Sequence, residues 1–136
     1  MTERRPDRFR GPRHDEFWAW CEKGELRLQR CASCARRAWP VVAACEHCGG
    51  AQLDWERMSG RGRIVSWCAF HYDYYQGLMP LPYDAILVEL EEGPLFISNP
   101  VGVDFAGLTA DAPAQVAFLD CEDSAGPFRL PVFKPA

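Results

Sequence analysis

Apolar and polar residues alternate along most of the second half of the chain. The alternation is clear at residues 53–58 (LDWERM) and 114–121 (AQVAFLDC), and it has the period of a strand with one buried face. Residues 85–92 (AILVELEE) and 94–99 (PLFISN) have the pattern of a hairpin. With a closing segment at residues 127–133, the pattern predicts about five strands after residue 53.

Residues 63–72 (RIVSWCAFHY) predict the longest strand, and both of its faces are apolar. The glycine-containing stretch SGRG precedes it. A strand buried on both sides after glycines suits the curved first strand of a small barrel. We therefore expect a mainly β fold that ends in a five-stranded barrel of the OB type. The two faces would carry Ile64, Cys68 and Phe70 on one side and Val65, Trp67 and Ala69 on the other.

A short helix is predicted at residues 15–24 (DEFWAWCEKG). Asp15 can cap its start and Gly24 can end it. Phe17, Trp20 and Cys21 fall at helical spacing and would face the core, whereas Trp18 lies off that stripe and is a candidate contact residue.

The segments around this helix are shorter. Residues 1–13 hold two prolines, a glycine and five arginines, which favours a mobile arm in the free protein. A solvated tail and an arm that docks on a partner both fit this composition. After the helix, residues 25–30 (ELRLQR) alternate as a strand, and residues 35–42 (ARRAWPVV) predict a hairpin.

The loop at residues 72–83 is unusually apolar for a connection between strands. Such a loop needs a cover, so either a partner lies over it or it folds back into its own barrel. If a partner covers it, the contact residues would be Tyr72, Tyr74, Tyr75, Leu78, Met79 and Tyr83, together with Trp18.

Charge is distributed unevenly around a formal net of −4. Residues 84–125 contain nine acidic residues and no lysine or arginine. Because cations that neutralise phosphates supply most of the affinity for nucleic acid, this segment is a poor platform for such binding. The sequence has no apolar run of about 18 residues and no signal peptide. Unpaired cysteines and a site of metal-binding thiolates suit a reducing compartment, so we expect a cytoplasmic protein.

Four cysteines form two C-x2-C pairs, Cys31/Cys34 and Cys45/Cys48, separated by ten residues. Two such pairs brought together by a hairpin give a tetrahedral S4 site, which is closed to substrate and therefore structural. Iron in a rubredoxin-like centre satisfies the same spacing, but we expect one zinc ion. The remaining three cysteines are scattered, which argues against a disulfide framework.

No catalytic constellation is evident in the sequence. Cys68 and His71 are three residues apart, which on a strand places their side chains on opposite faces. They therefore do not form a nucleophile–base pair. The carboxylates from Glu89 to Glu92 have no cationic neighbour in sequence and fit a solvated edge.

The order of these motifs resembles the DUF35 family, whose members join a zinc ribbon to an OB-fold and are associated with acyl-CoA thiolases. The likeness covers nearly the whole chain after Asp15. It departs from the family pattern at residues 111–116 (DAPAQV), where a Gly-Met/Pro-Val segment is usual, so we expect a differently shaped loop there. The matching stretches are GELRLQR-C-x2-C, C-x2-C-G, LDWERMSGRGRI, the Pro82–Tyr83 pair before V-E-L-x-E-G, and the closing LPVFKP.

The resemblance implies a non-catalytic subunit that forms a hetero-oligomer with a thiolase-superfamily enzyme, namely a thiolase, or a thiolase-like aldolase or acyltransferase. It would complete or seal the acyl-CoA channel, with the acyl-CoA thioester at the interface as the shared substrate. The chain alone would be inactive, and neither nucleic acid nor a membrane would be a partner. The implied organisation is an N-terminal arm and short helix at residues 1–24, a rubredoxin-like zinc ribbon at 25–55 and an OB-fold at 56–136.

Two alternatives remain at this stage. An OB-fold and zinc-ribbon protein could bind nucleic acid, because both modules serve that role elsewhere. A rubredoxin-like electron carrier would be red in its ferric form, whereas a zinc protein is colourless.

Overall fold

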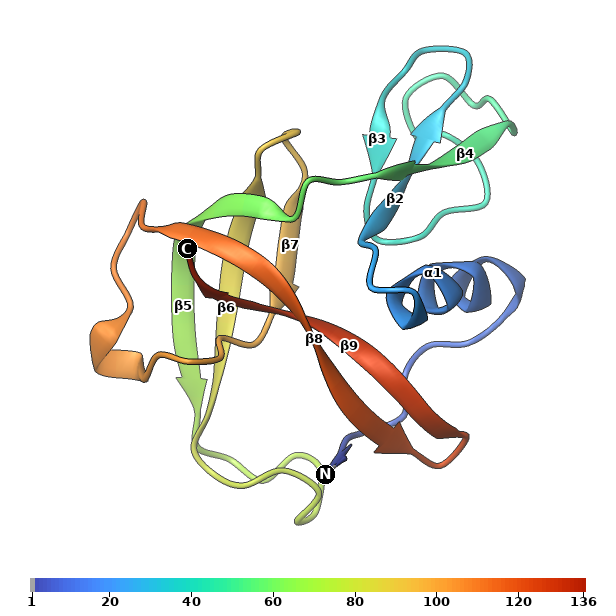
Figure 1. The fold of residues 1–136 in the computed structure, drawn as a ribbon. Helices are drawn as coiled ribbons and strands as arrows, with labels where there is room; N and C mark the ends of the chain where they lie inside the picture. Colours follow the sequence, from blue (N-terminus) through green and yellow to red (C-terminus); the bar gives the residue numbers. More distant parts are fainter. Residues whose placement is uncertain (1) are drawn as a thin grey trace.

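A computed structural model describes residues 2–136, and it is mainly β with one α-helix in that range. The strands form a three-stranded sheet and a six-stranded sheet. Figure 1 shows the smaller sheet and helix α1 beside a curved barrel formed by the larger one. The expected order of helix, ribbon and barrel is therefore confirmed.

The smaller sheet is the ribbon, and it consists of β2 (Arg27–Cys31), β3 (Arg37–Ala38) and β4 (Leu53–Arg57) in the order β3-β2-β4. The strand at residues 53–58 was expected among the strands of the barrel. It forms β4 of the ribbon and pairs with β2. The hairpin turns between β2 and β3, at the first cysteine pair, and not within residues 35–42.

A buried glutamine satisfies backbone groups of the chain after it leaves the ribbon sheet at the end of β3. Gln29 is only 3% exposed. Its side-chain amide donates to the carbonyl of Val42 at 3.0 Å and accepts the N–H of Val42 at 2.8 Å. The side chain thus replaces a strand partner, because buried backbone groups need hydrogen bonds.

Five strands form the barrel: β5 (Arg61–Phe70), β6 (Tyr83–Leu90), β7 (Leu95–Ser98), β8 (Pro113–Asp123) and β9 (Gly126–Pro135). The barrel closes between the end of β7 and β9, where the N–H of Phe133 donates to the carbonyl of Asn99 at 3.1 Å. A single 3₁₀ turn, η1 (Phe105–Gly107), lies in the long connection before β8.

The expectation that β5 is buried on both faces is wrong. A bulge between Ile64 and Ser66 interrupts its alternation and curves the strand. Ile64 is 5% exposed, but Val65 is 36% exposed and Cys68 is also exposed. Of the two glycines in the SGRG stretch, Gly62 lies closer to the backbone of β6, where a Cβ would be 2.5 Å from the carbonyl oxygen of Glu89.

Helix α1 (Pro12–Glu22) begins three residues before the predicted start. Its N-cap is Gly11, and Asp15 lies in the first turn, where its carboxylate accepts the N–H of Gly11 at 3.3 Å. Phe17 and Cys21 are buried as expected. Trp20 is only half-buried, because its ring stacks under the guanidinium of Arg27 at 3.9 Å instead of entering the core.

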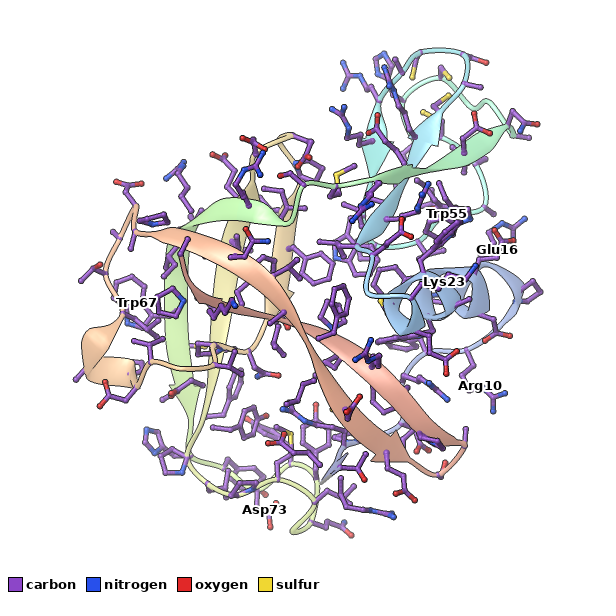
Figure 2. The ribbon with its side chains drawn as sticks, viewed as in Figure 1. Arg10, Glu16, Lys23, Trp55, Trp67 and Asp73 are labelled. Atoms are coloured by element: carbon purple, nitrogen blue, oxygen red, sulfur yellow. The ribbon has the colours of Figure 1, made fainter. Side chains whose placement is uncertain are left out.

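Three aromatic rings join the helix, the ribbon and the barrel. Trp39, which follows β3, has its ring centroid 4.7 Å from Phe17 of α1 and 4.7 Å from Phe96 of β7. A second link connects β4 to α1, where the indole N–H of Trp55 donates to the carboxylate of Glu16. Figure 2 shows this pair where the ribbon meets the helix. Aromatic contacts of this kind hold the modules in one arrangement.

The N-terminal segment is docked on the barrel, so the prediction of a mobile arm is wrong. Strand β1 (Glu3–Arg4) pairs with β8 in parallel. The guanidinium of Arg8 lies 3.2 Å from the carboxylate of Asp123, which is fully buried. The arginine-rich arm and the acidic strand β8 therefore complement each other within the chain.

Candidate metal centre and partner surface

The four cysteines of the two C-x2-C pairs converge at the tip of the ribbon. Their sulfur atoms all lie within 4.8 Å of one another. The Sγ atoms of Cys31 and Cys48 are 3.5 Å apart, and those of Cys34 and Cys45 are 3.6 Å apart. Figure 2 shows a group of sulfur atoms at this tip.

These distances fit a tetrahedral zinc ion. Four thiolates at about 2.3 Å from zinc place neighbouring sulfurs about 3.8 Å apart. With four sulfurs present, no ligand position remains for His47, which is exposed to solvent. Gly50 packs closely against the cluster, because a Cβ there would lie 3.3 Å from Sγ of Cys31 and 3.4 Å from Sγ of Cys48.

Backbone amides prepare two of the sulfurs for a metal. The N–H groups of Cys34 and Ser33 point at Cys31 and lower its pKa to about 6. The N–H groups of Cys48 and His47 likewise lower the pKa of Cys45. Because the thiolate is the metal ligand, this arrangement favours the ligating form.

Cys48 differs from Cys31 and Cys45, because its surroundings disfavour the thiolate. The N–H of Gly50 favours its thiolate, but the nearby sulfur of Cys31, burial and the other two sulfurs outweigh that donor. Together they raise the pKa of Cys48 to about 12. A divalent cation at the centre would remove this repulsion.

The other three cysteines lie apart from the cluster. Cys21 is fully buried, and burial raises its pKa to about 12. Cys121 is also buried. Cys68 is exposed, and within residues 2–136 it forms no hydrogen bond to a histidine or a carboxylate.

The loop between β5 and β6 lies on the surface and leaves the barrel unplugged. Tyr72 and Tyr74 are 68% and 63% exposed, and Tyr75, Leu78 and Leu81 are also exposed. The alternative in which this loop folds back into its own barrel is therefore wrong. Figure 2 shows Asp73 at the outer edge of this loop.

Four of the residues selected from the sequence for partner contact come together around one hollow. Trp18, Tyr75, Met79 and Tyr83 line a hollow of about 280 Å³ beside the arm. Leu78 lines a neighbouring hollow of about 350 Å³, and Tyr72 and Tyr74 line neither. Whether these residues contact a partner stays a prediction.

Sequence reasoning missed the side chains that complete the smaller hollow. Phe9 of the arm and Phe128 and Leu130 of β9 also line it. The indole N–H of Trp18 donates to the carbonyl of Phe9 at 3.0 Å, and the Trp18 ring lies 5.3 Å from that of Phe128. No periodicity links residues so far apart in the sequence. Phe9 itself could have been selected, because it is the one aromatic residue of the arginine-rich arm.

The carboxylates Glu89 and Glu91 of the β6–β7 hairpin lie on an exposed edge, as expected, but they have arginine partners that the sequence did not reveal. Glu89 pairs with Arg63 at 2.9 Å, and Glu91 pairs with Arg61 at 3.0 Å. Register across the antiparallel β5–β6 pair brings these charges together. One oxygen of Glu92 accepts the N–H of Ser59 at 2.7 Å at the junction of ribbon and barrel.

Two family models match consecutive parts of the chain. Residues 18–54 match the rubredoxin-like zinc ribbon domain of ChsH2, and residues 55–119 match its C-terminal OB-fold domain. The first match and the sulfur cluster together identify the tip of the ribbon as a structural zinc site. In residues 2–136, no helix is long and apolar enough to cross a membrane.

Two curated relatives are longer than this chain. A probable enoyl-CoA hydratase alpha subunit from Thermomonospora curvata is 31% identical over 100% of the chain and 43% of its own length. A DUF35 domain-containing scaffold protein from Pyrococcus furiosus is 27% identical over 62% of the chain and 54% of its own length. The chain thus spans about half the length of these relatives.

One solved structure is similar over almost the entire chain. It is described as an Ltp2-ChsH2(DUF35) aldolase. The match has a TM-score of 0.82 at 27% identity, and it covers 95% of this chain and 98% of the other. The consecutive zinc-ribbon and OB-fold matches, the scaffold relative and this structure agree with the motifs read from the sequence, and the chain belongs to the DUF35 family.

Proposed function

We propose that this chain is a non-catalytic accessory subunit of an acyl-CoA-processing complex and binds a thiolase-superfamily enzyme. The observation that carries the proposal is the structural similarity to a chain of the Ltp2-ChsH2(DUF35) aldolase structure. The match covers 98% of that other chain. The hydratase subunit and the scaffold protein among the relatives agree with a role in acyl-CoA chemistry and in assembly.

The surface of the chain supports this role. The exposed aromatic loop and the hollow around Trp18 form a contiguous apolar area of a kind that marks interaction sites. We propose that the partner enzyme covers this area and that an acyl-CoA thioester, the shared substrate, lies at the interface. In that arrangement the chain helps to form or seal the acyl-CoA channel.

Nucleic acid is a weaker candidate for this surface. Aromatic residues for stacking are present in the β5–β6 loop, which is one of the loops that OB-folds use for oligonucleotides. Arg8, however, already pairs with Asp123 and Arg5 with Glu3, so part of the positive charge of the arm is neutralised internally.

Mixing the two proteins is expected to create activity that neither has alone. The partner for this assay is the product of a thiolase-like reading frame adjacent to the gene for this chain. Thiolysis or retro-aldol cleavage of acyl-CoA is measured with each protein and with the mixture, and the mixture should exceed the sum. If the purified chain alone turned over acyl-CoA, and Cys68→Ala or His71→Ala abolished this, the non-catalytic assignment would be wrong.

Substitutions in the loop should separate binding from folding. Tyr75→Ala and Met79→Ala are expected to weaken complex formation or raise the acyl-CoA KM, because they remove apolar contact area. Zinc content and melting temperature should change little, since the loop lies outside the core. Titration against the partner, with parallel thermal melts, measures both. Losses of about 2–5 kcal/mol in stability, typical of core truncation, would contradict a contact role.

A further inference from the structure

Two hollows form one continuous trough between the N-terminal arm and the β5–β6 loop, which we call the arm–loop trough. The wider hollow, about 350 Å³, is lined by Glu3, Arg4 and Arg5 on one side and by residues from Leu78 to Asp84 on the other. The aromatic hollow of about 280 Å³ shares Arg5, Met79, Tyr83 and Asn99 with it. Figure 1 shows the start of the chain between the end of β8 and this loop.

Strand β1 is an edge strand of the six-stranded sheet, with β8 as its neighbour on one side. The N–H of Arg5 donates to the carbonyl of Glu122 at 2.9 Å and therefore faces β8. Backbone groups of successive residues in a strand point in opposite directions, so the N–H and C=O of Arg4 point away from β8. An edge of this kind can pair with an added strand.

Next to this edge, the aromatic hollow of the trough can hold a side chain of an added strand. Phe9, Trp18, Tyr75, Tyr83 and Phe128 surround the aromatic hollow, and Phe9 is 81% exposed. This hollow has the size and composition for one large apolar side chain, as in ligand sites where apolar walls hold an anchor.

Although the chain carries a net charge of −4, the trough has more positive than negative side chains around it: Arg4, Arg5 and Arg8 line the two hollows together with Glu3 and Asp84. The side chain of Arg4 is 61% exposed, and its contact with Glu122 is long, at 3.8 Å. An occupant that complements this excess of positive charge carries acidic residues.

We propose that the arm–loop trough docks an extended segment of the partner enzyme by strand addition to β1. The segment would pair with the free N–H and C=O of Arg4, place one aromatic or long apolar side chain in the aromatic hollow, and direct an acidic residue at Arg4. Strand addition takes affinity from main-chain hydrogen bonds and specificity from side-chain pockets. The inference rests on the proposed function, because the occupant belongs to that enzyme.

A proline at position 4 tests this mechanism. Arg4→Pro removes the outward N–H but no hydrogen bond to β8, and the extended backbone of Glu3 already suits a following proline. Arg4→Ala is the matched control, because it removes the same charge and keeps the N–H. Arg4→Pro is expected to bind the partner enzyme about five- to tenfold more weakly than Arg4→Ala, the usual effect of one backbone hydrogen bond. The two variants should have equal melting temperatures.

Amide hydrogen exchange supplies a readout independent of substitution. In the wild-type chain, the Arg4 N–H should exchange more slowly when the partner enzyme is bound than when the chain is free. Equal affinities for the two variants together with unchanged exchange at Arg4 would overturn strand addition and leave the proposed function standing. Wild-type chain that does not bind the enzyme would overturn the proposed function and this inference with it. If the Arg4 N–H were protected from exchange in the chain alone, and this protection increased with chain concentration, the edge of β1 would pair with a second copy of the chain. That result would overturn the inference.

Discussion

Replacing Cys34 or Cys45 with serine is expected to yield insoluble protein or protein unable to bind its partner. Each sulfur lies within 4.8 Å of the other three, so the loss of one leaves an incomplete tetrahedron. Structural zinc sites in isolated peptides bind the metal with an apparent free energy of about 10–16 kcal/mol. That is comparable to or larger than the entire stability of a small domain, which is about 5–15 kcal/mol.

The measurement is zinc content together with thermal melting of the purified protein. Wild type should contain close to one zinc per chain and lose its cooperative transition when a chelator removes the metal. Cys68→Ser is a suitable control, since Cys68 is an exposed cysteine outside the cluster. A metal-free wild type that melts at an unchanged temperature would show that the site is not a folding element.

Arg8→Ala is expected to cost about 3 kcal/mol of unfolding free energy. The Arg8 guanidinium lies 3.2 Å from the Asp123 carboxylate, and the two side chains are 15% and 0% exposed. Removal of one partner from a buried pair leaves an uncompensated charge, which is strongly destabilising. Arg8 also lies 4.6 Å from the centre of the Phe128 ring, so the truncation removes a cation–π contact as well.

Denaturant or thermal unfolding measures this effect, and a loss of about 3 kcal/mol corresponds to roughly 10 °C in Tm. Arg4→Ala is the control within the same arm. Its pair with Glu122 is exposed and 3.8 Å long, so it should contribute less than about 1 kcal/mol. Equal melting of both variants and wild type would mean that the arm is not held by its buried pair.

Several features could be predicted because neighbouring residues in sequence carry the signal. The strands at residues 85–92 and 114–121 follow from alternation, which depends only on the period of the backbone. The exposed position of the β5–β6 loop could not be predicted from the sequence. An apolar loop is compatible both with cover by a partner and with folding back into its own barrel. The structure decided between these two for the free chain.

Local rules also misplaced particular residues. Trp20 has helical spacing with Phe17 but stacks on Arg27 of β2, and the bulge after Ile64 changes which face of β5 is buried. In both cases tertiary contacts override the periodic pattern, because a bulge or a stacking partner is not encoded in the spacing of apolar residues.

The sequence by itself determined the metal centre. A C-x2-C loop directs two thiolates at one point through backbone geometry that spans only a few residues, so four ligands could be named without coordinates. Tertiary structure alone decided the docking of the arm and the trough beside it. Arg8 and Asp123 are 115 residues apart, and such a contact forms only after the barrel brings the end of β8 beside the arm. Its position depends on the packing of the entire fold, which no local pattern specifies.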